Sequence, residues 1–396
     1  MKLLLPLFIL LSLSLFSQSK KELIYQLSQK EKELEEQQII RLELEEKLAK
    51  AEKKLRYKKE QFRIIDKELI WLYDVINNPY ATIDNHVRLC PKSIKEDADA
   101  LVEYFDEVTE TDIEKARAIY VWLTDNIRYD DYSINNDKYG DNSAAGVLRS
   151  KKSVCAGFAA LYEYFGLKMG LDIKEVSGYA KGVGYEPGMS FIGTDSDHVW
   201  NMIKIDGEWR VFDATWGGGS GKIDKNGKLR SIKEFDDNWF NISPEEAIFT
   251  HYPEDKSLLL LESNISLEDF GRLPNIDISA FRSKLLKAED VLDDYITKIQ
   301  TKYPVIYRPH ALVNVVQAPK TKTLTKGQAY VFDIYAPKAL NIYLYDDDGP
   351  RRVFKRNLDK TSFAIQYVPK IEGQLRISIE WQNSYGKLVF LEYEVN

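Results

Sequence analysis

Residues 196–216 read SDHVWNMIKIDGEWRVFDATW, and the fold prediction starts from this stretch. Two runs rich in Val, Ile, Phe and Trp flank Asp206-Gly207, and an Asp-Gly pair between two such runs is a strong short-range signal of a β-hairpin. We therefore expect two antiparallel strands joined by a tight turn centred on this pair. The turn would place Trp200 directly opposite Asp213 across the ribbon.

The same register brings a histidine and a carboxylate onto one face of the ribbon. His198 would lie opposite Thr215 and diagonally from Asp213, and diagonal neighbours have Cβ atoms roughly 7 Å apart. A carboxylate can hydrogen-bond an imidazole over that span. A His–Asp pair held on a rigid ribbon supplies two of the three members of a nucleophilic catalytic triad. The remaining question is whether the chain supplies the nucleophile.

Cys155 is the candidate nucleophile. It follows two lysines, Lys151 and Lys152, at the start of a helix predicted over residues 154–170. Helix N-termini carry partial positive charge and free N–H groups, which stabilise a thiolate. Cys90 precedes a proline and has no such setting. A lone cysteine is more often a small buried hydrophobe, so it is the combination with a same-face His and Asp that favours catalysis.

The predicted roles follow from this order of residues. Cys155 would be the thiolate nucleophile, His198 the base and then the acid, and Asp213 would hold the tautomer and orientation of the imidazole. The backbone N–H of Cys155 would supply one oxyanion donor. A Cys90–Cys155 disulfide is the alternative that would abolish this site.

Metal and cofactor sites are not predicted. The two cysteines and four histidines are scattered without the spacing of metal ligands. We therefore expect neither a metal ion nor a cofactor. The net charge of −7, with no basic patch interleaved with aromatic residues, also predicts that the protein binds no nucleic acid.

The N-terminal residues predict export. A lysine at position 2 precedes an apolar run over residues 3–16, and small residues follow at Ser17 and Ser19. This is the pattern of a secretory signal peptide over residues 1–19, and the alternative is an uncleaved N-terminal anchor. No later run is apolar for long enough to cross a bilayer as a helix. We expect a periplasmic, cell-surface or secreted protein without an integral membrane segment after signal removal.

Residues 20–76 predict a coiled coil or a long amphipathic helix. Apolar side chains recur at heptad spacing, at Leu27, Leu34, Leu48, Leu55, Phe62 and Leu69. Polar residues interrupt the second apolar position of the heptad repeat, which weakens the predicted packing between helices. Self-association through this helix and a solvated spacer helix therefore both stay open.

The rest of the chain predicts an α+β domain followed by an all-β domain. Residues 80–302 would form the catalytic domain, with a connector over residues 256–302. Within it, residues 130–142 are predicted to be a polar loop, and the glycine-rich residues 217–222 a flexible connection that lacks the Ser or Thr of a phosphate loop. Residues 303–396 contain short alternating runs separated by Pro, Gly, Asp and Asn, which predict a β-sandwich.

Three stretches resemble the transglutaminase-like superfamily. They are SVCAGFAAL at residues 153–161, SGYAKG at 177–182 and DHVWNMIKIDGEWRVFDATWG at 197–217. The GYAKG sequence and WFNISPEEAIFTHYPED at residues 239–255 look most like the kyphoscoliosis peptidase-like branch. The resemblance covers about residues 100–270. It implies a papain-like fold in which the family's Cys, on a helix, and His and Asp, on adjacent strands, fall on Cys155, His198 and Asp213.

The resemblance also implies a function. We expect an exported cysteine enzyme that forms an acyl-enzyme at Cys155 from a protein or peptide amide and passes the acyl group to water or to an amine. Lys181 and Tyr185 match the pattern of the branch and are candidates for shaping the substrate cleft. The alternative is a non-catalytic scaffold or binding protein that keeps the fold. A buried Cys155 with His198 turned away from it would favour this alternative.

Overall fold

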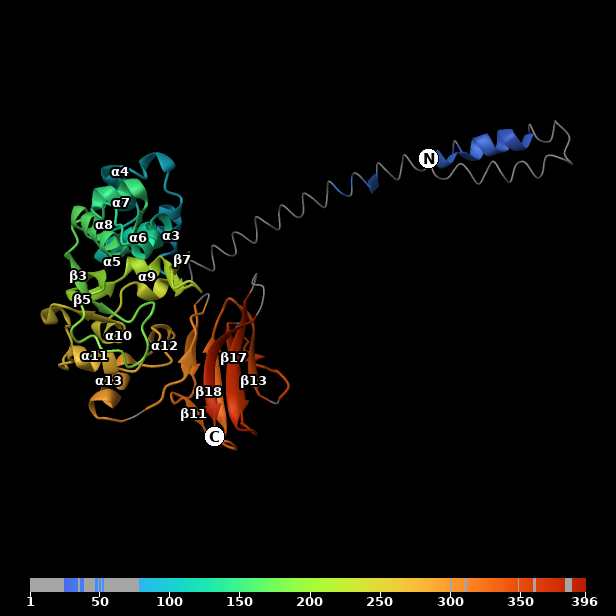
Figure 1. Ribbon diagram of the computed structural model, residues 1–396. Coiled ribbons are helices and arrows are strands. Elements are labelled where there is room, and N and C mark those ends of the chain that lie inside the picture. Colours follow the sequence, from blue (N-terminus) through green and yellow to red (C-terminus); the bar gives the residue numbers. More distant parts are fainter. Residues whose placement is uncertain are drawn as a thin grey trace. The chain divides into compact units, whose positions relative to one another are not determined.

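Figure 1 shows the protein as a computed structural model. The structure describes residues 25–34, 36–38, 47–48, 50, 52 and 78–396, except residues 300, 310–311, 348, 359–360 and 382–386. The chain divides into two compact units between Ile76 and Asn77.

The first unit is described in part. Residues 25–34 and 36–38 are helical. The signal peptide and most of the predicted coiled coil lie outside the described residues, so both stay predictions. In the described part of the chain, every helix is too short or too polar to cross a membrane.

A four-stranded antiparallel sheet lies at the centre of the second unit. Its strand order is β5-β4-β3-β8, with strands at Ile173–Ala180 (β3), His198–Ile205 (β4), Glu208–Phe212 (β5) and His251–Pro253 (β8). β4 and β5 form the predicted hairpin in the predicted register, because Asn201 pairs with Phe212 and Ile205 with Glu208. Asp206 and Gly207 have φ angles of 51° and 88°, as a type I′ turn requires.

The ladder ends earlier than the sequence predicted. Asp213 is the N-cap of α9 (Ala214–Gly217), and its side chain accepts hydrogen bonds from the N–H groups of Thr215 and Trp216. Thr215 therefore lies in a helix, and the expectation that it pairs with His198 is wrong. An aspartate side chain that caps the backbone competes directly with a strand ladder.

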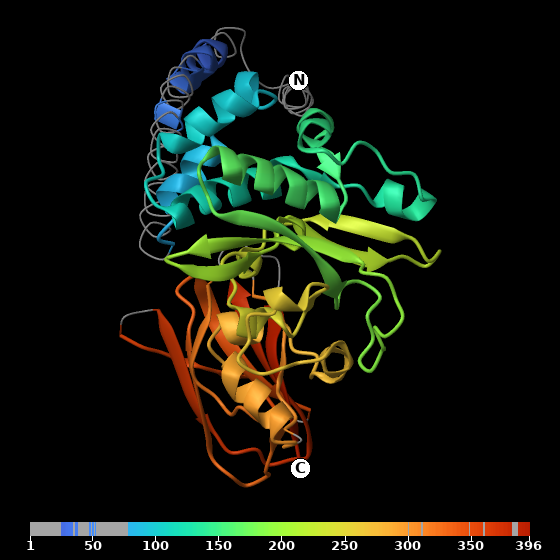
Figure 2. The same ribbon diagram turned by 90° about the vertical axis from the view of Figure 1, so that its left-hand side faces the viewer.

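Helices cover one face of this sheet. They are α3 (Ala81–Arg88), α4 (Ala98–Asp106), α5 (Asp112–Asn126), α7 (Ala144–Ser150) and α8 (Cys155–Lys168). α5 begins at the predicted capping box of Thr111 and Glu114. The buried residues of these helices form one hydrophobic cluster with Ile203, Ile205 and Phe212 of the hairpin. Figure 2 shows the helices on one side of the strands and the later elements on the other.

The opposite face packs against shorter helices. These are α10 (Pro244–Ala247), α11 (Leu267–Arg272), α12 (Ser279–Arg282) and α13 (Ala288–Ile296), with 3-10 turns at Lys92–Ile94, Asp237–Trp239 and Lys256–Leu258 elsewhere in the unit. Trp200 and Met202 of β4 belong to this second cluster. Alternate residues of β4 are therefore buried on opposite faces, so the sheet is covered on both sides.

The C-terminal part consists of two β-sheets. One has the order β11-β18-β17-β13-β14, with β9 also paired to β18, and the other has the order β10-β12-β16-β15. The strands are β9 (Val305–Ile306), β10 (Asn314–Gln317), β11 (Thr323–Leu324), β12 (Tyr330–Tyr335), β13 (Ala339–Asp346), β14 (Arg352–Val353), β15 (Lys355–Arg356), β16 (Ser362–Tyr367), β17 (Gly373–Trp381) and β18 (Lys387–Val395). Their buried residues continue the cluster beneath the central sheet. The protein is thus a mixed α+β molecule with C-terminal, mostly antiparallel sheets.

Two segments predicted to be irregular have regular structure. Residues 130–142 contain α6 (Asp131–Asn136), and the glycine-rich stretch enters the hairpin of β6 (Gly219–Ile223) and β7 (Leu229–Lys233). Asn135 donates a hydrogen bond of 2.9 Å to the carbonyl of Leu229. The Ser231 N–H donates one of 3.0 Å to Asp131. These contacts join residues about a hundred positions apart, which no local pattern could indicate.

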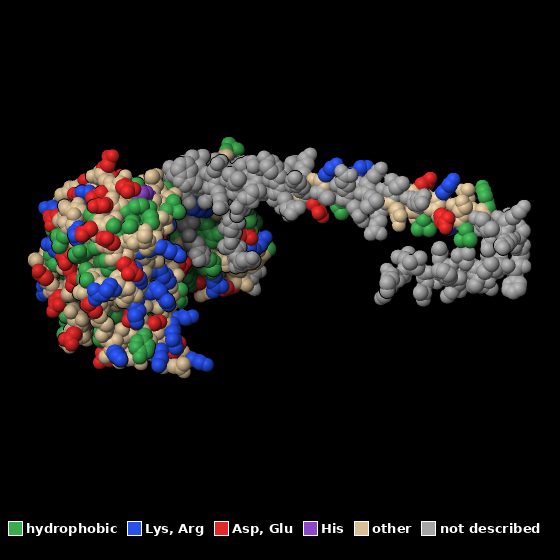
Figure 3. Space-filling view, turned by 90° about the horizontal axis from the view of Figure 1, so that it is seen from above, with side chains coloured by type: hydrophobic (Ala, Val, Ile, Leu, Met, Phe, Trp, Pro, Cys, Tyr) green, Lys and Arg blue, Asp and Glu red, His purple; other side chains and the backbone are tan. Residues whose placement is uncertain are grey.

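Charged side chains of both signs are interspersed over the face shown in Figure 3. A protein that binds a nucleic-acid duplex would instead gather Lys and Arg into a continuous stripe. The expected absence of nucleic-acid binding remains a prediction.

Candidate active site

Cys155 is the first residue of α8, and Val154 is the N-cap. The first N–H groups of a helix have no intrahelical acceptor, so they are free to face negative charge next to the thiol. The side chain of Cys155 is half-buried, and Cys90 and Cys155 are both free thiols. The disulfide that would have blocked the predicted site is therefore not formed.

Two connections position the start of α8. The short strand β1 (Arg128–Tyr129) pairs in parallel with β2 (Lys152–Ser153), immediately before the helix. In addition, the buried side chain of Asn201 in β4 donates a hydrogen bond of 3.1 Å to the carbonyl of Ala159 in α8. The helix that carries Cys155 is thereby fastened to the strand that carries His198.

His198 and Asp213 form a buried pair. His198 is the first residue of β4, and its Nε2 lies 2.7 Å from Oδ2 of Asp213. Burial alone would lower the pKa of His198, but the charge and hydrogen bond of Asp213, together with a hydrogen bond to Cys155, raise it to about 10. Burial alone would raise the pKa of Asp213, but His198 and then His251 hold it well below its usual range. The pair therefore favours an imidazolium beside a carboxylate at neutral pH.

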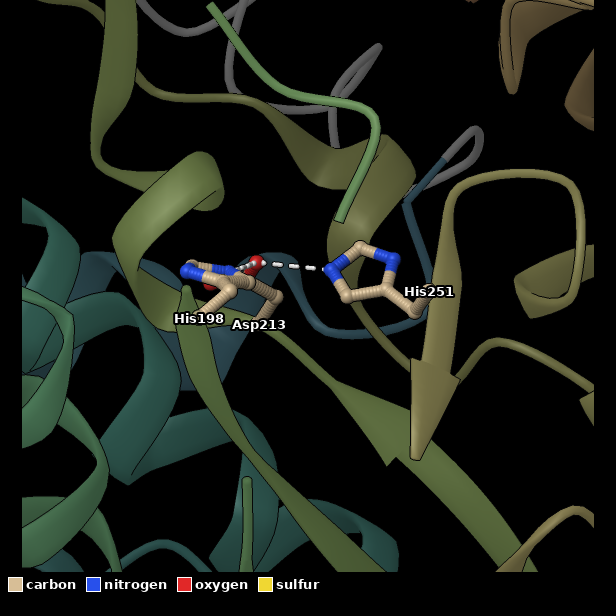
Figure 4. Close-up of side chains that lie close together, drawn as sticks. All are labelled: His198, Asp213 and His251. Atoms are coloured by element: carbon tan, nitrogen blue, oxygen red, sulfur yellow. Dashed lines mark hydrogen bonds and ion pairs between the residues drawn. The ribbon is translucent and has the colours of Figure 1, made fainter. Parts of the chain in front are cut away.

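The second ring nitrogen of His198 is left for the thiol. Nε2 binds Asp213, and in Figure 4 the other nitrogen points away from the carboxylate. Cys155 also raises the pKa of His198, and Nδ1 is the ring nitrogen that Asp213 leaves available to it. α8, β4 and the N-cap of α9 thus bring the three residues predicted from the sequence together.

Asp213 accepts four hydrogen bonds. Its Oδ1 accepts from the N–H groups of Thr215 (2.8 Å) and Trp216 (3.0 Å). Its Oδ2 faces Nε2 of His198 at 2.7 Å and Nε2 of His251 at 3.1 Å. Four acceptor positions are about the full capacity of a carboxylate, so the orientation of this side chain is determined on every side.

His251 is a residue that sequence reasoning missed. It is the first residue of β8, is buried, and pairs with Ala180 of β3. A signal was present, because residues 239–255 are among the stretches that resemble the kyphoscoliosis peptidase-like branch. That resemblance assigned no role to His251, and 38 residues separate it from Asp213.

A cavity of about 610 Å³ opens beside His198. It lies between the β6–β7 hairpin and the loop over residues 181–197, and its lining is mainly apolar and glycine-rich with a few charged side chains. Trp216 lines it and stacks on His198, with ring centroids 5.2 Å apart. The indole therefore shields one side of the His198–Asp213 pair.

Tyr129 is a second residue that sequence reasoning missed, and no sequence signal pointed to it. It lines the cavity together with His198, and its strand partner Ser153 lies two residues before Cys155. Burial, and next the negative charge of Cys155, raise the pKa of the Tyr129 phenol well above its usual range. The hydroxyl therefore stays protonated and can donate a hydrogen bond near Cys155.

The two candidates for the substrate cleft are placed differently. Tyr185 lines the cavity, and its hydroxyl lies 3.4 Å from the carbonyl of Gly271. Lys181 is buried, and its Nζ donates a hydrogen bond of 3.2 Å to the carbonyl of Leu273. Burial lowers the pKa of Lys181 to about 8. Tyr185 is therefore among the described residues that line the cavity, and Lys181 is not. A role for either residue in binding substrate stays a proposal.

Within the described part of the chain, His198, Asp213 and His251 form the group that could hold a metal ion, because their ligand atoms lie within 4.8 Å of one another. These atoms are already joined by hydrogen bonds, with the carboxylate between the two rings (Figure 4). A zinc ion would need all three at about 2.0–2.2 Å around a common centre, so these hydrogen bonds would have to break. The expected absence of a metal stays a prediction.

Residues 99–214 match the model of the transglutaminase-like superfamily. They form a transglutaminase-like domain. Cys155, His198 and Asp213 all lie within this transglutaminase-like domain, whereas His251 lies beyond its last matched residue.

Two curated relatives are similar to the chain over this region. The kyphoscoliosis peptidase of Homo sapiens is 33% identical over 177 residues, which cover 44% of this chain and 26% of that protein. The kyphoscoliosis peptidase of Mus musculus is 32% identical over 178 residues, which cover 45% of this chain and 26% of that protein. Because the match spans 26% of each relative, their activity as whole proteins is not assigned to this chain.

The chain also aligns with a crystal structure of a TGase. The sequence identity is 18%, the alignment covers 32% of this chain and 34% of that one, and the TM-score is 0.25.

Proposed function

We propose that the protein is a cysteine acyl-transfer enzyme that forms an acyl-enzyme at Cys155 from a protein or peptide amide. The observation that carries the proposal is the arrangement of His198, whose Nε2 lies 2.7 Å from Oδ2 of Asp213 and whose pKa is raised by Asp213 and by Cys155. His198 lines the cavity, and the thiol of Cys155 is half-buried. The name of the similar kyphoscoliosis peptidases supports amides as substrates.

The first half of the reaction is acylation. The Cys155 thiolate attacks the amide carbonyl and forms a C–S bond, and the N–H of Cys155 and the hydroxyl of Tyr129 stabilise the oxyanion. The His198 imidazolium then gives its Nδ1 proton to the amide nitrogen. The C–N bond breaks, the amine leaves, and a thioester remains on Cys155. Asp213 stays ionised throughout and holds Nε2–H of the ring.

The second half returns the free enzyme. Neutral His198 takes a proton at Nδ1 from water or from an amine, which attacks the thioester carbonyl. The C–S bond breaks, the acid or the new amide leaves, and Cys155 departs as a thiolate beside the imidazolium. Hydrolysis and transamidation therefore share every group named here and differ in the acceptor that enters the cavity.

A thiol-directed acyl probe tests this proposal. We expect wild-type protein to form a covalent adduct at Cys155 and the Cys155→Ala variant to form none, as measured by mass spectrometry of peptides. The Cys90→Ala variant is the matched control and should be labelled like wild type. Labelling that persists in Cys155→Ala, or a wild type that stays unlabelled at every pH, would overturn the proposal.

The scaffold alternative predicts a different arrangement of Cys155 and His198. It needs a buried sulfur with His198 turned away, whereas Cys155 is half-buried and hydrogen-bonded to His198. This arrangement supports the enzymatic proposal. Export, predicted from residues 1–19, is part of the proposal and is tested by sequencing the N-terminus of the mature protein.

A further inference from the structure

Two buried histidines share one oxygen of Asp213. Nε2 of His198 and Nε2 of His251 both lie within hydrogen-bond distance of Oδ2, at 2.7 and 3.1 Å. Figure 4 shows the carboxylate between the two rings, with His251 approaching from β8. An ionised carboxylate only accepts hydrogen bonds, so both Nε2 atoms carry a proton. The reaction proposed above uses His198 and leaves His251 without a role.

The surroundings of His251 determine its charge and tautomer. Burial lowers the pKa of its imidazole, against the opposing effect of Asp213. His198 and Asp197 are the other charged groups that act on it, the first lowering and the second raising its pKa. The ring is therefore neutral. Because the ring is neutral and Nε2 donates to Asp213, Nδ1 is an acceptor, and it lies 2.8 Å from the Thr250 hydroxyl.

Aromatic side chains hold the ring of His251 in place. The centroid of the Trp216 ring lies 4.6 Å from that of His251, Trp200 lies at 5.0 Å and Trp239 at 5.6 Å. The ring therefore has little freedom to turn, and its N–H keeps its direction toward Asp213. A buried histidine in such a cage could equally serve packing alone, which the experiment must separate from a role in the reaction.

We propose that His251 is a positioning residue, which donates its Nε2–H to Asp213 and thereby holds the carboxylate in the orientation that fixes His198 against Cys155. The inference rests on the function proposed above. Asp213 is anchored on one side by the N–H groups of α9, and on the other side His251 supplies the second donor to Oδ2. Without that donor, a buried carboxylate oxygen loses a partner, and a side chain with an unfilled acceptor position rotates toward other donors.

Three variants separate the donor from the packing. His251→Gln keeps an N–H donor near the position of Nε2, and His251→Phe keeps an aromatic ring but removes the donor. Thr250→Val removes the hydroxyl that selects the tautomer of His251 and leaves the histidine itself in place. Each variant is made in the full chain, and its melting temperature is recorded beside that of wild type.

The measurement is the rate at which iodoacetamide alkylates Cys155 between pH 5 and 9, followed by mass spectrometry of the Cys155 peptide. This reaction needs no substrate. The ring N–H signals of His198 and His251 are followed by ¹⁵N NMR, which is practicable with four histidines in the chain. The NMR spectrum reports the tautomer and the hydrogen bond of His198 directly.

We expect alkylation below pH 8 to fall about tenfold or more in His251→Phe, the effect of losing a hydrogen bond to a charged group. In His251→Gln the rate should stay within about twofold of wild type, and Thr250→Val should fall between the two. The ring N–H signal of His198 should broaden in His251→Phe and stay sharp in His251→Gln. A purely structural role would lower the melting temperature and leave the pH profile of folded protein unchanged.

Two results overturn the inference. The first is a folded His251→Phe whose alkylation profile and His198 signal match those of wild type. The second is an equal loss of alkylation rate in His251→Gln and His251→Phe, which would show that the Nε2–H donor of His251 is not the cause. A failure of the proposed function looks different, since wild-type Cys155 itself would then react no faster below pH 8 than a free cysteine peptide.

Discussion

At Cys155 three separate influences act on one sulfur atom. The N–H groups at the start of α8 face it, the ring of His198 hydrogen-bonds it, and Tyr129 lines the cavity nearby. His198 and Tyr129 are distant from Cys155 in the sequence, and the N–H groups come from the helix that Cys155 begins. The reactivity of the thiol is therefore a property of the assembled site, and single substitutions at its partners should change it.

The first prediction concerns the charge of Asp213. Asp213→Asn keeps an N-cap side chain for α9 but removes the negative charge beside His198. The pKa of His198, raised to about 10 in the native protein, should fall, so the imidazolium would be lost at a lower pH. We expect alkylation of Cys155 at pH 6 to fall at least about tenfold, the effect of losing a charge-assisted hydrogen bond.

A second buried aspartate serves as the control. Asp236 also accepts an N–H hydrogen bond at an N-cap, from Asn238, and its carboxylate pairs with Arg308 instead of with His198 or Cys155. The Asp236→Asn variant should alkylate at the wild-type rate. If both variants lose reactivity equally, the charge of Asp213 is not the cause.

The second prediction concerns the phenol of Tyr129. Tyr129→Phe keeps the ring and removes the hydroxyl that we place near the oxyanion. The rate of labelling by the acyl probe should fall about tenfold, as for removal of one weak oxyanion donor. Alkylation by iodoacetamide passes through no oxyanion, so its rate should stay unchanged. Tyr139→Phe, at an exposed tyrosine, is the control, and equal effects on both reactions would contradict this role.

At the scale of elements, the close approach of α8 to the strand before it leaves little room for substitution. A Cβ added at Gly157 would lie 2.0 Å from Oγ of Ser153 and 2.6 Å from Cγ2 of Val147. Ser153 in turn donates a hydrogen bond of 2.7 Å to Asn142. The first turn of α8, which carries Cys155, therefore has no room to move toward β2.

The third prediction follows from this lack of space. Gly157→Ala should destabilise the protein by about 1–3 kcal/mol through overpacking, measured as the free energy of unfolding in urea. It should also slow labelling of Cys155 because the helix start is displaced. Gly140→Ala is the control, because a Cβ there meets nothing within 4 Å. A Gly157→Ala protein as stable as the control would show that the turn relaxes freely.

At the scale of the whole second unit, side-chain contacts join the segment after β9 to the residues around α5. Arg308, just after β9, donates a hydrogen bond of 2.7 Å to the carbonyl of Phe235, and its Nε lies 3.2 Å from Oδ2 of Asp236. The carbonyl of Asp236 also accepts from the hydroxyl of Tyr120 in α5, at 2.5 Å. One buried aspartate thus links the segment after β9 to α5.

The fourth prediction concerns this link and its pH dependence. Burial raises the pKa of Asp236, and Arg308 opposes that rise. A carboxyl group with a raised pKa favours the folded state at low pH and loses this contribution as pH rises through its folded pKa. Arg308→Ala should therefore lower the free energy of unfolding by about 1–3 kcal/mol at pH 7, and by less near pH 4, where a larger fraction of Asp236 is protonated.

Urea unfolding at the two pH values measures this effect. The double variant Arg308→Ala with Asp236→Asn is the control, since it removes the uncompensated charge and should recover part of the loss at pH 7. A loss for Arg308→Ala that is the same at both pH values would point to packing of the arginine stem instead of the charge.

The amino-acid sequence by itself determined the hairpin, its register and the helix that begins at Cys155. These features depend on residues a few positions apart, where turn chemistry and capping act directly. The five longest strands of the C-terminal part followed from their alternating pattern in the same way. The order of Cys155, His198 and Asp213 indicated a triad before any distance was known.

Only the tertiary structure decided the rest. The strand ends before Asp213 because the carboxylate caps α9, and α6 and the β6–β7 hairpin form because they bind each other across the chain. His251 reaches Asp213 because β8 pairs with the far edge of β3. Contacts of this kind join residues that are distant in sequence, so they stabilise the structure once the sheet is assembled. The sequence indicated Cys155, His198 and Asp213, and the fold added His251 as a second histidine on the same carboxylate.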